Sequence, residues 1–268
     1  MLFDVHTHPP RDKSLTGVWL DGLSRFDARA LTSELASRTA GWELVPSVDH
    51  WREANEICAE IVRAHPDQLL GYVYVNPAHT AEALAEMERR LLGEPEVFVG
   101  LKLWQAVRCS DARLDPLMEF CAAHDVPVLQ HTFANVGPTG AGSGNAPGES
   151  MPEDLRALAA RHPRVRFIAA HFGGDWEWGA ASYAHADNVW VDVSGGEALG
   201  GYMATALRYV GAGRILFATD SYGRSVPSQL AKVMGEPLPD ADLERILWRN
   251  AVDAAGPRLP AAWRTHFS

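Results

Sequence analysis

The sequence predicts an α/β fold of the (β/α)₈ barrel type, in one domain that spans residues 1–268. Short apolar segments alternate with helical patterns eight times, which is typical of parallel α/β folds. Segments such as 71–75 (GYVYV) and 166–170 (RFIAA) are dense in apolar residues, as expected of strands covered on both faces. A doubly wound open sheet is the competing fold. That fold normally has a glycine-rich turn after its first strand, where this chain has DVHTHPP at 4–10.

Each element follows from its local pattern. Short apolar runs predict strands at 2–8, 42–47, 69–75, 98–104, 126–131, 165–171, 189–193 and 214–219. Helical periodicity predicts helices at 28–39, 51–64, 80–92, 114–123, 152–161, 175–185, 198–210, 225–234 and 240–255. The stretch 9–26 is rich in Asp, Arg, Lys and Gly, and we expect it to be a polar loop before the first helix.

Composition limits the classes of partner. The chain has 24 Lys and Arg against 34 Asp and Glu, a formal charge of −10, which argues against nucleic acid or an anionic membrane as partner. A small-molecule substrate is expected instead. Cys58, Cys109 and Cys121 are too few and too scattered for a disulfide framework or a cysteine zinc site. The sequence shows neither a secretory signal nor an apolar run of membrane-spanning length, so we expect a cytoplasmic protein.

The histidines fall into two groups by position. One group stands at the ends of predicted helices, where an imidazole can meet the last carbonyl groups, and comprises His65, His124, His162 and His185. The other group stands where predicted strands end, and comprises His6, His8, His131 and His171. In a parallel barrel all strand ends converge on one face, and that face carries the active site. The second group therefore predicts a functional site.

A carboxylate joins this group at the end of the last strand. Asp220 closes the apolar run 215–219, and an unpaired buried carboxylate is costly unless a cation holds it. The last and first strands are neighbours in a closed barrel, which brings Asp220 beside His6 and His8. With His131, three nitrogens and one oxygen form a set that suits Zn²⁺ and also Fe, Mn or Co.

These residues also carry a family resemblance. The motifs are DVHTH at 4–8, QH at 130–131, AHFGGD at 170–175, FATD at 217–220 and ILWRNA at 246–251. Together they span nearly the whole chain, which resembles the amidohydrolase superfamily. The similarity is to its amidohydrolase 2 branch of metal-dependent TIM-barrel hydrolases and decarboxylases.

The resemblance implies a set of roles. His6, His8 and His131 would bind one divalent metal ion, with Asp220 as a ligand or proton acceptor and His171 as the general acid or base. Zn²⁺ is the favoured ion, with Mn²⁺, Fe²⁺ and Co²⁺ as alternatives. Asp4, two residues deeper than His6, is interpreted as support for the site and not as a ligand. Relatives of the branch are often dimers, so a homodimer is an open prediction.

Lys102 admits three interpretations, because a lysine inside a covered strand needs a partner. It pairs with an inward carboxylate such as Asp192 or Asp220, or it contacts the substrate, or it is carboxylated and bridges two metal ions. The third arrangement occurs in binuclear members of the superfamily. A single metal is commoner in the branch that this chain resembles.

Further residues in the predicted strand-to-helix loops are candidates for substrate binding. Arginines there could clamp a substrate carboxylate, and aromatic rings could stack on an apolar ring. The candidates are Arg11, Trp104, Arg108, Trp176, Tyr222 and Arg224. The glycine-rich stretch 135–150 is predicted to be a mobile lid over the site.

The leading functional hypothesis is a metal-dependent hydrolase that acts on an amide, lactone or related bond of a small carboxylate-bearing substrate. Metal-activated water would be the nucleophile. The alternative is a non-oxidative decarboxylase that uses the same metal site. The short loop after the first strand favours hydrolysis, because the decarboxylases of the branch tend to carry an insertion there. A lesser alternative is a non-catalytic relative that only binds a metal or ligand.

Overall fold

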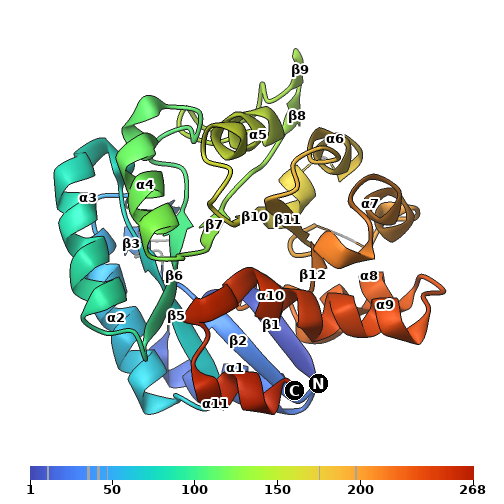
Figure 1. Cartoon of the computed structure of the whole chain (residues 1–268), viewed down its shortest axis with the longest axis horizontal. Coiled ribbons are helices and arrows are strands. Elements are labelled where there is room, and N and C mark those ends of the chain that lie inside the picture. Colours follow the sequence, from blue (N-terminus) through green and yellow to red (C-terminus); the bar gives the residue numbers. More distant parts are fainter. Residues whose placement is uncertain (11, 35–36, 41–42, 47, 175, 197) are drawn as a thin grey trace.

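The computed structural model describes residues 1–268 except 11, 35–36, 41–42, 47, 175 and 197. Eight parallel strands form one sheet surrounded by helices (Figure 1), which confirms the predicted (β/α)₈ barrel. In their order around the sheet, the strands are β1 (Leu2–Thr7), β2 (Ala28–Thr32), β5 (Leu69–Tyr74), β6 (Phe98–Leu103), β7 (Val128–Gln130), β10 (Phe167–Ala169), β11 (Val189–Asp192) and β12 (Ile215–Leu216).

The barrel closes between its first and last strands. The Val5 N–H donates to the Phe217 carbonyl (3.2 Å), and the Asp220 N–H donates to the His6 carbonyl (2.8 Å). A parallel bridge joins Thr7 to Ser221 beyond the end of β12. The segment that carries Asp220 therefore lies beside the segment that carries the two histidines, as the sequence predicted.

The helices cover the outside of the sheet and end in a C-terminal group. They are α1 (Thr16–Ser24), α2 (Trp51–Ala64), α3 (Thr80–Met87), α4 (Asp115–Ala123), α5 (Pro152–Arg161), α6 (Trp176–Ser182), α7 (Tyr202–Val210), α8 (Val226–Met234), α9 (Asp240–Glu244), α10 (Asn250–Ala255) and α11 (Ala261–His266). Turns of π-helix, Glu88–Leu92 and Arg245–Arg249, continue α3 and join α9 to α10. None of the described helices is long and apolar enough to cross a membrane.

The predicted boundaries of two helices and three of the four predicted helix-capping histidines agree with the structure. The helix α2 has the predicted bounds, and so does α5. His65, His124 and His162 are the C-terminal capping residues of α2, α4 and α5, as the first histidine group predicted. His185 lies beyond the end of α6 and does not cap it. The side chain of His162 contacts Asp115 (2.7 Å) instead of a carbonyl group.

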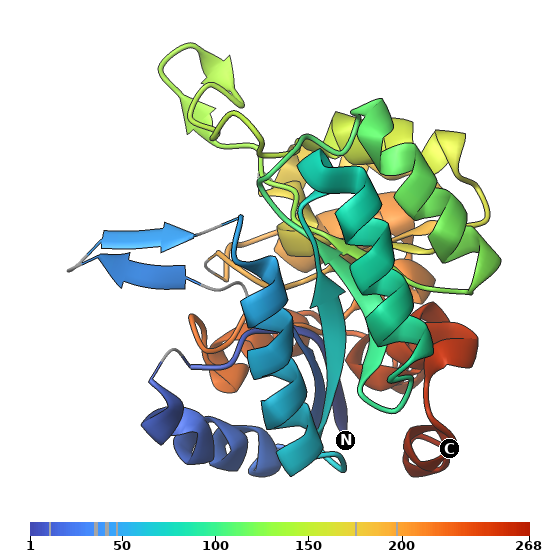
Figure 2. The ribbon, with the colours of Figure 1, turned by 90° about the vertical axis from the view of Figure 1, so that its left-hand side faces the viewer.

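The assignment of the second barrel strand was wrong. The predicted helix 28–39 begins with β2 (Ala28–Thr32), whose strand pairs with β1 and β5. The described part of the predicted strand 42–47 is β4 (Glu43–Pro46), which pairs antiparallel with β3 (Ser37–Ala40) in a hairpin that projects from the barrel (Figure 2). Trp42 and Ser47 lie outside the described residues. Four of the five residues of the segment ARALT are good helix formers, and burial between two strands overrides that local preference.

The N-terminal loop also differs from its prediction, since α1 occupies 16–24 of the stretch 9–26. The glycine-rich stretch 135–150 contains a second small hairpin, β8 (Val136–Gly137) with β9 (Gly140–Ala141). The helix α11 was not predicted. It contributes Trp263 to an apolar cluster with strand residues, and the adjoining Phe267 stacks on Phe3 with ring centroids 4.8 Å apart.

Asp4 links the two strands at the closure. One of its carboxylate oxygens accepts the backbone N–H groups of Thr219 (3.0 Å) and His6 (3.2 Å), and the other accepts the Thr219 hydroxyl (2.6 Å). The side chain is fully buried, and burial raises the pKa of this carboxyl to about 7. Asp4 thus holds in register the segments that carry His6 and Asp220.

We expect Asp4→Ala to lower the free energy of unfolding by about 3 kcal/mol, because it leaves the buried Thr219 N–H and hydroxyl without their acceptor. Asp4→Asn retains one acceptor and is expected to lose less. Urea unfolding of both variants and the wild type, in the presence of a chelator, measures the difference. An Asp4→Ala variant as stable as the wild type would contradict this role.

Candidate metal centre

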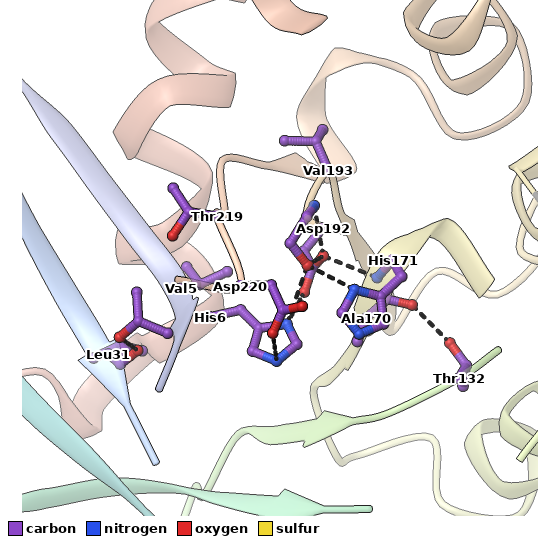
Figure 3. A network of polar contacts seen from close by, with 12 residues as sticks. Val5, His6, Leu31, Thr132, Ala170, His171, Asp192, Val193, Thr219 and Asp220 are labelled. Carbon is purple, nitrogen blue, oxygen red and sulfur yellow. Dashed lines mark hydrogen bonds and ion pairs between the residues drawn. The ribbon is translucent and has the colours of Figure 1, made fainter. Parts of the chain in front are cut away.

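The strand-end residues meet on one face of the barrel, as the sequence predicted. His6 is on β1, Lys102 on β6 and Asp192 at the end of β11, whereas His171 and Asp220 follow β10 and β12. Figure 3 shows His6, His171, Asp192 and Asp220 directed toward one another from these different strands.

Three side chains form a compact cluster. His6 Nε2 lies 3.2 Å from His8 Nε2, and Asp220 Oδ1 lies 3.8 Å from the first nitrogen and 3.4 Å from the second. Ligand atoms about 2.1 Å from a tetrahedral ion lie about 3.4 Å from one another. The spacing of these three atoms therefore fits one shared divalent cation.

Hydrogen bonds fix which nitrogen of each ring carries its proton. His6 Nδ1 donates to an Asp192 oxygen (2.9 Å), and His8 Nδ1 donates to the Ser33 carbonyl (2.7 Å). Both lone pairs are then on Nε2 and face one another across the cluster. Two acceptors cannot hydrogen-bond to each other, so a cation is what this pair of lone pairs needs. A carboxylate or carbonyl behind each ligating histidine is the usual arrangement in metal sites.

Burial keeps the two rings neutral. It lowers the pKa of His6 well below the ordinary histidine value and that of His8 to about 3, with the Lys102 ammonium adding to both effects. Metal ions bind neutral imidazole, so this state suits ligation. Burial also raises the pKa of Asp220 to about 6, although the Lys102 charge opposes the rise.

Asp192 joins the cluster to the predicted acid or base. Its Oδ2 accepts from His6, and its Oδ1 accepts the N–H of His171 (2.9 Å), the N–H of Ser194 (3.0 Å) and the Ser194 hydroxyl (2.5 Å). Because that hydroxyl donates to Asp192, its oxygen accepts from His171 Nδ1 (2.9 Å). His171 is left with Nε2 as the nitrogen that can exchange a proton with a substrate.

The backbone at the two site loops is constrained. His171 has φ +61° and Asp220 has φ +57°, a conformation that non-glycine residues rarely adopt. Such residues persist where the surrounding structure holds them, and they concentrate at active sites. Gly195 is needed for a close approach, since a Cβ there would lie 2.6 Å from His171 Nδ1.

His131 lies near the cluster but has its own partner. Its ring centroid is 5.1 Å from that of His171, and its Nε2 contacts Glu149 Oε1 at 3.0 Å. Glu149 belongs to the stretch predicted as a lid, where it also accepts the Ala146 N–H (3.1 Å). The structure does not bring His131 into the group formed by His6, His8 and Asp220. Its role as a ligand stays a prediction.

The candidate substrate residues fall in different places. The Trp104 ring meets the His131 ring edge-on at 6.4 Å, next to the cluster. Arg108 is bound to Asp154 at the start of α5 (2.6 Å). Tyr222 and Arg224 line a cavity of about 510 Å³ between α1 and the start of α8. Arg11 lies outside the described residues, as does the side chain of Trp176.

Three residues that hold the site histidines in place were not identified from the sequence: Asp192, Ser194 and Glu149. Asp192 was considered only as a partner for Lys102, although it ends an apolar strand just as Asp220 follows one. Ser194 and Glu149 gave no signal of their own, since a serine or glutamate in a loop is ordinary. The buried positions of Asp192 and Ser194 depend on how β10 and β11 lie side by side.

Comparison with known proteins now identifies the family. A family profile described as amidohydrolase matches residues 3–254. The chain belongs to the amidohydrolase family. No curated protein matches the sequence.

Among solved structures, this amidohydrolase is similar to 5-carboxyvanillate decarboxylase from Sphingomonas paucimobilis (15% identity, TM-score 0.70, 94% of this chain and 98% of that one). A dihydroxybenzoic acid decarboxylase from a Polaromonas species, with bound manganese and the inhibitor 2-nitroresorcinol, is 17% identical (TM-score 0.69, 97% and 98%). The 4-oxalomesaconate hydratase from Rhodopseudomonas palustris is 15% identical (TM-score 0.70, 99% and 98%). At such identities the likeness establishes the fold.

We predict that Asp192→Asn weakens binding of Mn²⁺ by about 10- to 100-fold, because an amide can satisfy only one side of its contacts. If the NH₂ group of the new asparagine faces His6, then Nδ1 of His6 must accept and the ring proton moves to Nε2, the nitrogen that would bind the ion. If the amide oxygen faces His6 instead, the amide NH₂ faces the N–H groups of His171 and Ser194, and these donors lose their acceptor. Competition against a fluorescent chelator measures the affinity. Ser194→Ala keeps the Asp192 contact to His6 and removes only the longer contact of the Ser194 hydroxyl to His6 Nδ1 (3.2 Å), so it should lose much less affinity than Asp192→Asn. An equal loss in both variants would contradict the role of Asp192.

Proposed function

We propose that this amidohydrolase is a divalent-metal-dependent decarboxylase of a small carboxylate-bearing substrate. The observation that carries the proposal is a cation-binding cluster beside an anchored imidazole. The rings of His6 and His171 have centroids 5.0 Å apart, and one carboxylate, Asp192, holds both. The likeness to two decarboxylases supports a lyase over the hydrolase that the sequence favoured.

The ion would be held by His6, His8 and Asp220, with His131 as a further predicted ligand. When bound, a divalent ion supplies positive charge that binds substrate oxygens and stabilises the negative charge formed as the bond to CO₂ breaks. Manganese accompanies one similar decarboxylase, and Zn²⁺ remains an alternative on the donor set.

His171 is the proposed proton donor. Loss of CO₂ breaks a carbon–carbon bond and leaves the electron pair on the substrate carbon, which must gain one proton. Burial lowers the pKa of this ring well below its ordinary value, so the resting ring is neutral, with its proton on Nδ1 and a lone pair on Nε2. Nε2 would take a proton from a hydroxyl or acid group of the bound substrate and pass it to the carbon as the bond to CO₂ breaks. Ser194 holds Nδ1 in place, so the ring keeps one orientation through the transfer. Solvent then returns the proton, which balances the reaction.

Aromatic side chains near the cluster would accept a flat substrate ring. The Phe133 ring stacks on His131 with ring centroids 6.1 Å apart and meets His171 edge-on at 5.9 Å, and Trp104 meets His131 from another direction. A small space of about 50 Å³ adjoins Phe133 and His171. Rings in these orientations favour an aromatic or conjugated acid.

A second candidate function is the hydrolysis predicted from the sequence. One observation favours it. Asp220 Oδ1 lies 3.4 Å from His8 Nε2 and 3.8 Å from His6 Nε2, and the side chain is 24% exposed, so this carboxylate is within reach of a water molecule beside the cluster. A base beside a bound ion would suit the activation of water for attack on an ester or amide.

The proposal predicts that purified protein loaded with Mn²⁺ releases CO₂ from one or more hydroxylated benzoic acids, in a panel that includes 2,6-dihydroxybenzoate and 5-carboxyvanillate. Carbonic-anhydrase-coupled detection or mass spectrometry of the product measures the release. We expect chelation to abolish turnover and His171→Gln to lower kcat by about 10²- to 10⁴-fold, since proton transfer typically contributes that much.

Matched measurements separate the two candidate reactions. His171→Gln should bind Mn²⁺ like the wild type, because the ion is held elsewhere. His124→Gln, at the end of α4 and away from the site, should retain full activity. Hydrolysis of a lactone or amide panel without CO₂ release would favour the second candidate and contradict the first.

A further inference from the structure

Lys102 is a buried cation whose amine touches a histidine of the cluster. It lies on β6 with its side chain only 1% exposed, among the strand ends that carry the cluster. Its Nζ lies 2.9 Å from His6 Nε2. Since the His6 proton is on Nδ1, where Asp192 accepts it, Nε2 is an acceptor and Lys102 is the donor.

The contact uses the atom that a metal ion would use. An imidazole nitrogen has one lone pair, which can accept a proton donor or bind a metal ion but not both at once. The two cations would also repel each other at short range in a buried site. Lys102 and a divalent ion therefore exclude one another at His6 Nε2.

The surroundings fit a charged amine at this place. The Lys102 ammonium contributes, after burial, to the lowered pKa values of His6, His8, His131 and His171, so its charge reaches all four rings. Asp192 and Asp220 supply negative charge around it.

We propose that Lys102 is a built-in competitor of the metal ion: its ammonium and the divalent cation take the same lone pair of His6, so Lys102 sets the ion affinity of the centre. This inference rests on the metal centre of the proposed function. Lys102 acts through His6 and is a positioning residue.

Replacing the amine tests the competition. Lys102→Met removes the charge at similar length, and we expect the affinity for Mn²⁺ to rise about tenfold or more, because the lone pair is free and the repulsion is gone. Lys102→Arg keeps a cation and should show no such rise. Competition against a fluorescent chelator gives the dissociation constants without any substrate, and circular dichroism confirms the fold of each variant.

The outcomes are distinct. Unchanged affinity in Lys102→Met overturns the inference and leaves the metal centre intact. Weakened affinity also overturns it, and would point to the carboxylated, metal-bridging lysine. A wild-type protein that binds no Mn²⁺ overturns the metal centre and, with it, both the proposed function and the competition.

A second measurement uses the wild type alone, should Lys102→Met fail to fold. The chain has only three lysines, Lys13, Lys102 and Lys232, so ¹⁵Nζ-lysine labelling gives three side-chain signals. Lys13→Arg and Lys232→Arg assign them. Titration with diamagnetic Zn²⁺ should shift the Lys102 signal strongly as it loses its contact to His6. A Lys102 signal that stays in place while Zn²⁺ binds would contradict the proposal.

Discussion

The Asp192 carboxylate is the constraint on which the site depends. One of its oxygens fixes the proton of His6 on Nδ1, and the other accepts the backbone N–H of His171 (Figure 3). That second oxygen also accepts the hydroxyl of Ser194. These contacts decide two properties at once. They direct the His6 lone pair toward the cation-binding cluster, and they set the orientation of the ring that exchanges protons. The proposed ligand His6 and the proposed proton carrier His171 share one carboxylate and cannot shift independently, which is the fixed geometry that catalysis requires.

The closure of the barrel supplies the second constraint. Asp220 reaches His8 and His6 because the segment after β12 pairs with the end of β1, and Asp4 links the two segments by buried hydrogen bonds. The left-handed backbone at His171 and Asp220 shows that the site loops depart from relaxed geometry. Buried hydrogen bonds hold both of them, the first through Asp192 and the second through the His6 carbonyl. The strain is thereby kept where the functional side chains must project.

The metal site, the Lys102 contact and the two candidate reactions all depend on the attraction of this cluster for a cation. Two neutral histidines with facing lone pairs and one carboxylate attract positive charge, which either an ammonium or a divalent ion can supply. The same cluster would suit either proposed reaction, hydrolysis or decarboxylation, since both need stabilised negative charge on substrate oxygens. What separates them is the proton: Asp220 is placed to take one from water, and His171 to deliver one to carbon. The fold, shared with decarboxylases and a hydratase, leaves that choice to the side chains around the substrate.

The sequence by itself determined the alternation that makes a barrel and the strand-end position of His6, His8, His171 and Asp220, because parallel strands bring such residues to one face. It did not determine the second strand, since ARALT has the local preference of a helix and only burial between β1 and β5 makes it extended. The roles of Asp192, Ser194 and Glu149 were decided by tertiary structure alone. Each acts through a hydrogen bond to a residue 18 or more positions away, and no local pattern encodes such a distance. For Lys102, the sequence predicted a buried position on a strand, and only the tertiary structure showed that its amine contacts His6.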